Sequence, residues 1–313
     1  MSDSLRLSVP DLTSTEAAAE FYRVADAARD VDGYDPFNEQ ARLDVASGRR
    51  TPVVATVWSQ DEHARAIGAA IIGHGELDLV VDPIFRGKGF GGVAVSGLLP
   101  TIQGEVTAWS HGDHPAARIL AARHGFEAVR TLLQLRLSPI PDAAGAGPST
   151  SSGTGPSTSS GTGSGTASSA TIDAFDPSTD AAEWVALNAR VFAGHPEQGA
   201  ITDNDLRERM AESWFRAGDF LIARDASGIM IGYNWLKIEP GADEGEIYVI
   251  GVDASQAGRG LGRALMRAGL ERLGARGCSA ATLYVEADNV AAVHLYRSLG
   301  FADRTVDVQY RRP

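Results

Sequence analysis

Residues 246–266 read EIYVIGVDASQAGRGLGRALM, and this stretch decides the fold of the chain. Its first part, IYVI at residues 247–250, is apolar and rich in β-branched and aromatic residues, which is typical of a buried strand. A polar segment and three glycines at alternate positions follow, and helical periodicity begins near Arg263. The stretch therefore predicts a strand, a glycine-rich loop and a helix. Because glycines allow close approach of the backbone and a helix N-terminus suits a phosphate, we expect a pyrophosphate-binding loop.

Three kinds of phosphate loop compete for this stretch. The P-loop pattern G-x-x-x-x-G-K-[ST] is absent from it, and the Rossmann pattern G-x-G-x-x-G fails because Arg263 stands in the third glycine position. The third kind is the Q/R-x-x-G-x-G/A loop of the GCN5-related N-acetyltransferases (GNAT). Residues 256–262, QAGRGLG, resemble that loop: each residue that the pattern requires is found at its position or one residue away from it. A glycine-rich turn that only caps a helix is the remaining alternative.

A downstream segment favours the acetyltransferase interpretation. Residues 283–301, LYVEADNVAAVHLYRSLGF, predict a strand, an Asn at a helix start, a helix that carries a Tyr, and an L-G-F turn. This order resembles the closing half of the GNAT fold. The resemblance implies an α/β (α+β) fold, in which a mixed, mostly antiparallel twisted sheet is flanked by helices.

Composition limits the class of protein. The 313 residues suffice for about two domains of ~150 residues, and the formal charge of −12 argues against a nucleic-acid partner. The single cysteine, Cys278, excludes an internal disulfide and fits a reducing, cytoplasmic location. No signal peptide is evident, no apolar run approaches the ~18 residues of a membrane span, and no His/Cys cluster has metal spacing. We therefore expect neither a membrane nor a metal partner.

The two halves of the chain repeat each other. Residues 78–91 align without gaps on residues 249–262, and Gly125-Phe126 aligns on Gly300-Phe301. Between the halves, PSTSSGTG occurs twice, at residues 148–155 and 156–163, which is typical of a flexible linker. We therefore predict a first domain at 1–142, a linker at 143–170 and a second domain at 171–313, as a tandem duplication.

Periodicity predicts the remaining elements. Helices are expected at 13–31, through Leu43 and Val45, after the first-domain glycine loop as far as Leu99, and at 113–123, 181–192 and 205–215. Strands are expected at 53–58, 66–72, 77–81, 106–109, 220–224 and 230–237, with Glu246 opening the central strand. Residues 132–137 are expected to close the first sheet, and residues 305–311 the second.

A narrower resemblance involves residues 188–199 (NARVFAGHPEQG), 246–253 and 283–286. These segments resemble the mycothiol synthases, a family of tandem GNAT enzymes of actinobacteria. The resemblance covers both domains and is loose in the first. It implies transfer of an acetyl group from acetyl-CoA to the cysteinyl amine of cysteinyl-glucosaminyl-inositol, giving mycothiol, and we expect a monomer. The alternatives are a tandem GNAT that acetylates another small amine or a protein, and a non-catalytic acyl-CoA sensor.

Two residues are candidates for proton transfer. An amine must lose a proton before it attacks a thioester, and Glu246 at the start of the central strand suits a general base. Tyr296, on the helix after Asn289, suits a general acid for the departing thiolate. A solvated carboxylate and a core tyrosine are the simpler alternatives. Backbone N–H groups of residues 249–252 can stabilise an oxyanion if the strand splays there.

The resemblance also implies binding residues in the second domain. Acetyl-CoA contacts are expected from Ile250, Gly251, Val252, Gln256, Ala257, Gly258, Arg259, Gly260, Leu261, Gly262, Arg263, Asn289, Val290, Ala291, Ala292, Val293 and His294. The acceptor is expected to contact Glu39, Glu197, Lys237, Glu246 and Tyr284. His195, between Gly and Pro, is expected to shape its loop.

The first domain keeps the parts of a phosphate loop. These are Leu79, Val80, Val81, Arg86, Gly87, Lys88, Gly89, Phe90 and Gly91. It lacks the proton-transfer groups, because the alignment puts Gly75 where the second domain has Glu246, and Ala121 where it has Tyr296. We therefore predict that the first domain binds acetyl-CoA without catalysis. The match to G-x-G-x-x-G at Gly87, Gly89 and Gly92 is weak, because no acidic residue follows at the ribose distance.

Overall fold

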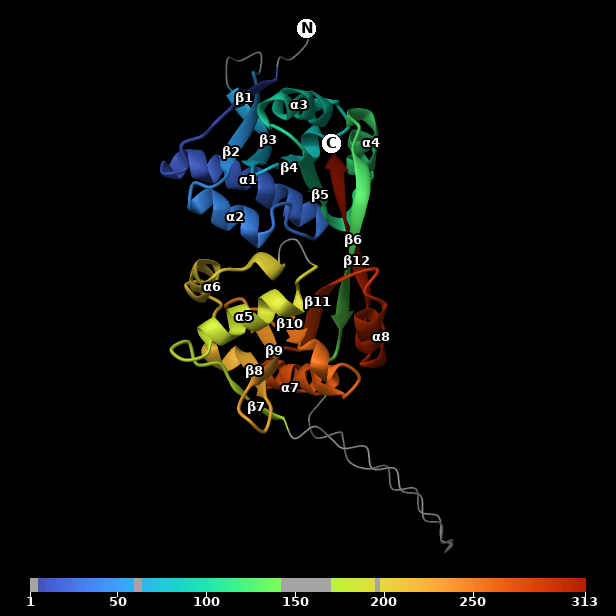
Figure 1. Ribbon diagram of the computed structural model, residues 1–313. Coiled ribbons are helices and arrows are strands. Elements are labelled where there is room, and N and C mark those ends of the chain that lie inside the picture. Colours follow the sequence, from blue (N-terminus) through green and yellow to red (C-terminus); the bar gives the residue numbers. More distant parts are fainter. Residues whose placement is uncertain (1–4, 59–63, 142–169, 195–197) are drawn as a thin grey trace, which may run out of the picture. The chain divides into compact units, whose positions relative to one another are not determined.

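The computed structural model describes residues 5–58, 64–141, 170–194 and 198–313. The chain forms two compact units (Figure 1). Unit 1 comprises residues 1–133, 286–289 and 305–313, and unit 2 comprises residues 134–285 and 290–304. The expected linker and parts of the loops near residues 60 and 195 fall outside the described residues.

Unit 1 contains a mixed sheet in the order β1-β2-β3-β4-β5-β12. Its pairings are antiparallel, except that β4 and β5 pair in parallel. The elements are β1 (Arg6–Ser8), α1 (Thr15–Asp32), α2 (Glu39–Ala46), β2 (Thr51–Trp58), β3 (Ala64–Gly73), β4 (Glu76–Val81), α3 (Phe90–Leu98), β5 (Val106–Ser110), α4 (Pro115–His124), and most of β6 (Glu127–Leu137) and β12 (Ala302–Arg312).

Helices cover both faces of the unit 1 sheet. In α1 the apolar side chains recur at helical spacing, and four of them are buried against the strands: Phe21, Val24, Ala25 and Ala28. Ser14 caps the start of this helix, and Gly33 ends it with a φ of 81°. On the other face, Leu98 of α3 packs with Leu77 of β4. Each face of the sheet therefore has its own apolar core.

Unit 2 repeats this arrangement with the strand order β11-β10-β9-β8-β7. The pairings are antiparallel, except that β10 and β11 pair in parallel. The elements are β7 (Thr171–Ala174), α5 (Ala181–Val191), α6 (Asp203–Met210), β8 (Phe220–Arg224), β9 (Met230–Lys237), β10 (Glu244–Val252), α7 (Leu261–Ala275), β11 (Ala280–Glu286) and α8 (Val290–Ser298). The sequence-based prediction of mixed, mostly antiparallel sheets flanked by helices is confirmed.

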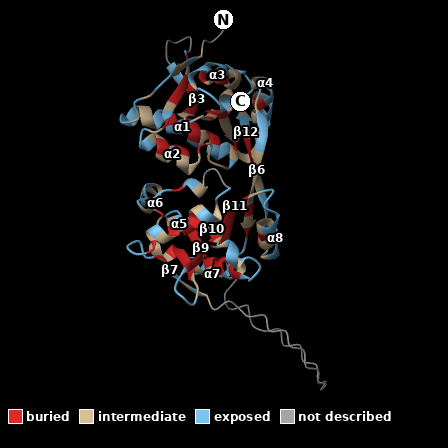
Figure 2. Ribbon diagram, in the orientation of Figure 1, coloured by how far each residue is buried: buried red, intermediate tan, exposed pale blue. Residues whose placement is uncertain are grey.

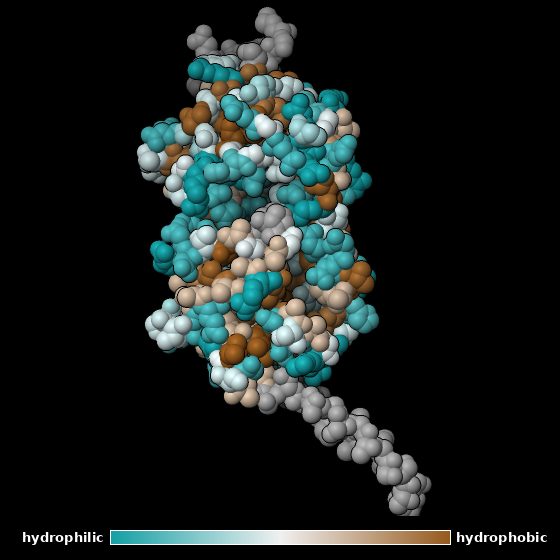
Figure 3. All heavy atoms as spheres, viewed as in Figure 1, coloured by the Kyte–Doolittle hydropathy of each residue, from teal (hydrophilic) through white to brown (hydrophobic). Residues whose placement is uncertain are grey.

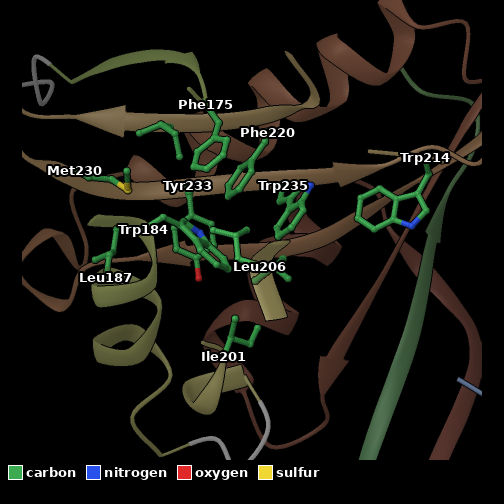
Figure 4. Close-up of a cluster of buried hydrophobic side chains, with 12 residues drawn as sticks. Phe175, Trp184, Leu187, Ile201, Leu206, Trp214, Phe220, Met230, Tyr233 and Trp235 are labelled. Carbon is green, nitrogen blue, oxygen red and sulfur yellow. The ribbon is translucent and has the colours of Figure 1, made fainter. Parts of the chain in front are cut away.

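Aromatic side chains dominate one core of unit 2 (Figure 4). Trp235 stacks on Phe220 with ring centroids 4.4 Å apart, and the edge of Trp184 meets Trp235 at 5.6 Å. On the opposite face, Leu261 and Leu265 of α7 pack against Ala223 and Ile231. Buried residues follow the central strands (Figure 2), and hydrophilic side chains are spread over the face shown in Figure 3.

The closing strands differ from the sequence-based expectation. Residues 305–313 belong to unit 1 and not to the second domain, and Val308 to Arg312 pair antiparallel with β5. Residues 134–137 of β6 belong to unit 2, where Arg136 Nε donates to Glu244 Oε2 at 2.6 Å. An alternating pattern fixes which face a side chain occupies but not which strand becomes the neighbour. The pattern therefore predicted both strands and misassigned their sheets.

Two boundaries also need correction. The helix expected at 205–215 is α6, which begins at Asp203 because Thr202 and Asp205 form a capping box, and which ends at Met210. The central strand β10 begins at Glu244, so Glu246 is its third residue rather than its first. The other expected helices and strands lie within a few residues of their predicted bounds.

Candidate active site

The loop after β10 has the geometry that its glycines predict. Asp253 accepts a hydrogen bond from the Ser255 N–H at 3.0 Å, which lowers the pKa of its carboxyl group. Gly258 and Gly260 follow with φ of 73° and 81°, a left-handed conformation that glycine adopts without strain. A Cβ at either position would meet no atom within 4 Å. The backbone angle, and not lack of space, is therefore what favours glycine in this loop.

The helix after this loop presents a free N-terminus. Because the N-cap residue of α7 is Gly260, no side chain of that residue caps the first turn. The first N–H groups of a helix lack partners within it, and with the helix dipole they favour an anion. A Cβ at Gly262 would lie 3.6 Å from Leu295 Cδ2, an ordinary van der Waals distance, so this position has room for a small side chain. Arg263 donates to Ser298 Oγ of α8 at 2.7 Å, so this arginine also fixes the neighbouring helix.

Next to the loop, β10 separates from β11. Their parallel pairing runs from Glu244–Ala280 to Ile247–Leu283, and no further β10–β11 pairing occurs in these two fully described strands. On the other side, the register against β9 shifts between Ile247 and Val249, which is a β-bulge. The expected splay is therefore present. The exposed backbone edge beyond Ile247 can pair with an extended amide chain and stabilise an oxyanion.

Glu246 lies where the two strands are still paired. It is half-buried and lies opposite Lys237 of β9 and Thr282 of β11. Side chains of directly opposed residues share one face of a sheet. The Lys237 ammonium lies 5.1 Å from the ring centroid of Trp214 and 5.8 Å from that of Tyr248. A carboxylate, an ammonium and two aromatic rings therefore line one face beside the splay.

Tyr284 shares this face. It lies two residues after Thr282 on β11, and side chains two apart on a strand point to the same side. The Tyr284 hydroxyl is exposed enough to reach solvent, with 45 % of the residue accessible, and it accepts a hydrogen bond from Gln134 Nε2 at 2.9 Å. The structure thus brings together three of the five predicted acceptor residues: Lys237, Glu246 and Tyr284.

The other two predicted acceptor residues are not placed there. Glu39 lies in unit 1, in the first turn of α2. Glu197 and its neighbour His195 fall outside the described residues. Their predicted roles stay predictions.

Tyr296 is buried in α8, with 6 % of the residue exposed. Its ring centroid lies 6.2 Å from that of Phe301. Burial raises the pKa of the Tyr296 phenol to about 12. The phenol therefore stays protonated at neutral pH, the form that a donor needs, and the raised pKa also makes it a weaker acid than an exposed tyrosine.

The remaining predicted acetyl-CoA residues lie at the N-terminal end of α8. Asn289 precedes the helix and is exposed, and Val290 is 74 % exposed. His294 is also exposed, whereas Ala292 and Val293 are half-buried. An apolar side chain as exposed as Val290 contributes little to the core, so this side chain is accessible to a ligand.

Unit 1 contains a cavity of about 410 Å³ beside its own glycine loop. Gly87 and Gly89 have φ of 75° and 86°, and Gly89 is the N-cap of α3, as Gly260 is of α7. The β4–β5 pairing consists of Glu76–Thr107, so these strands also diverge. Eight predicted residues line the cavity: Leu79, Val80, Val81, Arg86, Gly87, Gly89, Phe90 and Gly91.

The two cationic residues of this loop have protein partners. Arg86 donates from both terminal nitrogens to Asp32, each at 2.7 Å, and from Nε to the Val81 carbonyl at 3.0 Å. The Asp32 hydrogen bonds raise the pKa of Arg86. Lys88 Nζ lies 5.0 Å from the centroid of Phe85. The expectation that Arg86 offers its charge to a phosphate therefore needs correction, because Asp32 already neutralises it.

Sequence reasoning missed one feature that recurs in both units. Arg23 of α1 bonds Asp82 at 2.9 Å, and Arg190 of α5 lies 3.6 Å from Asp253. In each case an arginine of the first long helix holds the aspartate that begins the glycine loop. The aligned aspartates were visible in the sequence, but the arginines lie about 60 residues away along the chain and carry no local signal.

The described part of the chain contains no group of three or more His, Cys, Asp or Glu side chains arranged to hold a metal ion. Among its helices, none is long and apolar enough to cross a membrane.

Comparison with known proteins gives consistent results. The model of the acetyltransferase (GNAT) family matches residues 185–301. The chain is 44 % identical over 313 residues to a protein named mycothiol acetyltransferase from Clavibacter sepedonicus, covering 97 % of this chain and 96 % of the relative. It is 38 % identical to a protein of the same name from Salinispora arenicola, covering 99 % and 98 %.

Solved structures share the fold. A tandem GNAT protein from the clavulanic acid biosynthesis pathway superposes with a TM-score of 0.68 at 16 % identity, covering 98 % of each chain. A GCN5-related N-acetyltransferase from Sphaerobacter thermophilus gives a TM-score of 0.65 at 20 % identity, covering 99 % of this chain and 96 % of the other. At these identities the likeness concerns the fold alone.

Proposed function

Since the chain belongs to the mycothiol acetyltransferase family of GNAT enzymes, we propose that it acetylates the cysteinyl amine of cysteinyl-glucosaminyl-inositol with acetyl-CoA. The product is mycothiol. The observation that carries the proposal is the splay of β10 from β11 beside the uncapped start of α7, with Glu246 at its base. This arrangement offers a phosphate site, an amide-binding edge and a proton acceptor side by side.

Acetyl-CoA fits this site in one orientation. Its pyrophosphate suits the loop from Gly258 to Gly262 and the N–H groups that begin α7. Its pantetheine amides suit the β10 edge beyond Ile247, which places the thioester near Tyr248 and Val249. The acceptor then approaches along the face that carries Lys237, Glu246 and Tyr284, where polar side chains suit its hydroxyl groups.

The residues supply the proton transfers that the reaction needs. Glu246 removes a proton from the ammonium form of the acceptor, and the free amine attacks the thioester carbon. The oxyanion that forms is stabilised by backbone N–H groups of the splayed β10 edge. As the intermediate collapses, the C–S bond breaks and the phenol of Tyr296 donates its proton to the departing thiolate. The amide nitrogen keeps one of its two protons, and the other returns to the Tyr296 oxygen through solvent. A phenol with a raised pKa is in its protonated, donor form at neutral pH.

We also propose that unit 1 binds acetyl-CoA without catalysis, as the retained copy of a tandem duplication. Support comes from the matching glycine angles, at Gly87 and Gly258 and again at Gly89 and Gly260. Glu76 is the nearest carboxylate to the position equivalent to Glu246, and Arg50 binds it at 2.7 Å. A carboxylate that is already paired with an arginine is a poor base, because taking up a proton would cost it that ion pair.

Product analysis tests the main proposal. The full-length protein is incubated with acetyl-CoA and cysteinyl-glucosaminyl-inositol, with glucosaminyl-inositol and a peptide amine as control acceptors. Mass spectrometry should detect an acetyl group on the cysteinyl nitrogen of the first acceptor, with release of one CoA per acetylation. Acetylation of the controls at the same rate would favour a broader amine acetyltransferase, and binding without turnover would favour an acyl-CoA sensor. A cytoplasmic location and a monomeric state stay predictions.

A further inference from the structure

His111 lines the unit 1 cavity and is paired with a buried aspartate, Asp307. Nδ1 of His111, which follows β5, lies 2.8 Å from Asp307 Oδ2. Asp307 is 4 % exposed, and its other oxygen accepts from the Gly112 N–H at 2.9 Å. The His111 ring also stacks on Trp109, with centroids 6.4 Å apart and planes at 11°. The imidazole is therefore held in one orientation by a carboxylate and an aromatic face.

The second ring nitrogen of His111 has no partner among the described residues. Nε2 is buried and forms no hydrogen bond with the protein. Leaving a buried polar atom unpaired costs about 1–3 kcal/mol, so such atoms in folded proteins usually meet water or a ligand. Because Asp307 occupies Nδ1, Nε2 is the ring atom that remains for a ligand. Since His111 lines the cavity, the ligand of that cavity is the natural partner.

The C-terminal strand completes this site. Asp307 lies on β12, where the following residues pair with β5, Val308 with Ser110 and Gln309 with Trp109. Tyr310 of the same strand lines the cavity. One cavity residue, Tyr310, and the partner of another, Asp307, therefore come from the far end of the chain.

The charges around His111 favour its protonated form. Burial lowers the pKa of the imidazole, but the hydrogen bond and charge of Asp307, with the charges of Asp78 and Asp35, outweigh it and raise the pKa. Asp78 is itself bound to Arg50 at 2.7 Å. Asp307 is therefore the main cause of the raised pKa, and His111 is protonated at neutral pH more often than an exposed histidine.

Other ionisable groups lie near the pair. Tyr34 packs against Gly112 and lines the cavity, and burial raises the pKa of its phenol. Arg130 lies over Trp109, with its guanidinium carbon 5.3 Å from the ring centroid. The Arg86–Asp32 pair also lines the cavity, and its two charges neutralise each other. Tyr34 stays neutral below pH ~10. His114 also lines the cavity, and its Nδ1 accepts from the Ala116 N–H at 3.1 Å, so a pH dependence is assigned to His111 by its loss in a His111 variant.

We propose that His111, oriented by Asp307 of the C-terminal strand, donates a hydrogen bond from Nε2 to an acceptor oxygen of the ligand in the unit 1 cavity. This inference rests on the proposed function, in which that ligand is acetyl-CoA, whose thioester and amide carbonyl groups are such acceptors. His111 is thereby a binding residue of unit 1, and acetyl-CoA occupancy there depends on pH and on the C-terminal strand.

Equilibrium dialysis of labelled acetyl-CoA against the full-length protein tests the inference between pH 7 and 9.5. The wild type should bind two equivalents of acetyl-CoA. The site whose Kd follows the kinetic KM is assigned to unit 2 and the other site to unit 1. The affinity of the unit 1 site should fall as pH rises through the pKa of His111. His111→Phe keeps the aromatic stack but removes the donor, so it should weaken that site roughly 10- to 100-fold. His111→Gln retains an N–H donor, so its affinity should be close to that of the wild type at pH 7 but independent of pH.

Asp307→Asn is the second variant. It keeps a hydrogen-bonding side chain but removes the charge, so the pH dependence should shift to lower pH. The inference would be overturned if His111→Phe bound two equivalents of acetyl-CoA with unchanged affinity, or if the wild-type affinity of the unit 1 site did not change with pH. Either result would leave the acetyl-CoA role of unit 1 intact. A single equivalent in the wild type would overturn the acetyl-CoA role of unit 1 and this inference with it.

Discussion

Gly260→Ala tests the phosphate loop of unit 2 against a matched control. Gly260 is the N-cap of α7 with a φ of 81°, and Gly241, in the turn between β9 and β10, has the same φ of 81°. A Cβ at either position would meet no atom within 4 Å. The two substitutions therefore introduce the same backbone strain and no steric clash. They differ in location, because Gly260 belongs to the loop proposed to hold the pyrophosphate.

The strain sets the size of the effect. An alanine in the left-handed region costs about 1–2 kcal/mol, so both variants should lose about that much unfolding free energy. If the loop of Gly260→Ala relaxes to relieve the strain, acetyl-CoA must restore the original loop conformation when it binds. Restoring that conformation costs up to the same ~1–2 kcal/mol. Since 1.4 kcal/mol is a factor of ten, the KM for acetyl-CoA should rise roughly 5- to 30-fold. The Gly241→Ala loop has no such contact, so its KM should not change.

Urea unfolding and steady-state kinetics with varied acetyl-CoA measure the two quantities separately. The expected result is similar destabilisation in both variants and a raised KM in Gly260→Ala alone. An equal KM in both variants, at equal loss of stability, would refute the assignment of this loop to the pyrophosphate.

Three further predictions concern the core, the proposed acid and the linker. Trp235→Ala, at a site stacked on Phe220 and fully buried, should lower the unfolding free energy by about 3–5 kcal/mol in urea, whereas Trp58→Ala, at a 49 % exposed position, should change it by less than ~0.5 kcal/mol. Tyr296→Phe should lower kcat without changing the KM for acetyl-CoA. Because the wild-type phenol has a pKa raised to about 12, kcat should show no loss from its ionisation below pH ~10, and a kcat in Tyr296→Phe equal to that of the wild type would contradict the assignment. Deleting residues 148–155 should change kcat/KM by less than about twofold, because loop closure varies slowly with length, and a larger loss would show that the linker has a role in the reaction.

Local pattern predicted the elements of the fold but not all of their partners. The glycine loop was predictable because left-handed backbone angles favour glycine, and both loops have those angles at Gly87, Gly89, Gly258 and Gly260. The exchange of the closing strands was not predictable, because alternation is the same whichever sheet accepts a strand. It also means that expressing 1–142 and 171–313 separately would remove a strand from each unit. Point variants of the whole chain are therefore the better test.

The sequence likewise predicted some residues of the candidate site but not the contacts between them. Glu246 and Lys237 were named from the sequence, and their direct pairing across β9 and β10 follows from a register that the structure supplies. The rings of Trp214 and Tyr248 around Lys237 were missed, because the helix expected at 205–215 ends at Met210 and leaves Trp214 in a turn. The partners of Arg86 and His111 depend on residues distant in sequence, for which periodicity carries no signal.

The role of Glu246 is the centre of the account, and Glu244 provides its control. Both are carboxylates of β10, but Glu244 is bound to Arg136 at 2.6 Å and to Arg304 at 2.5 Å and has a lowered pKa, so it is a structural partner rather than a base. Glu246→Gln should keep the fold and the affinity for acetyl-CoA, because the phosphate loop and the β10 edge are untouched.

The decisive measurement is kcat for acetylation of cysteinyl-glucosaminyl-inositol by the wild type, Glu246→Gln and Glu244→Gln from pH 6.5 to 10. At pH 7 the Glu246→Gln variant should lose about 10²- to 10⁴-fold, which is the usual contribution of a general base. The deficit should shrink towards pH 10, where the acceptor amine loses its proton unaided, while Glu244→Gln stays close to the wild type throughout. A Glu246→Gln rate equal to that of the wild type at pH 7, or a deficit that does not change with pH, would contradict the account.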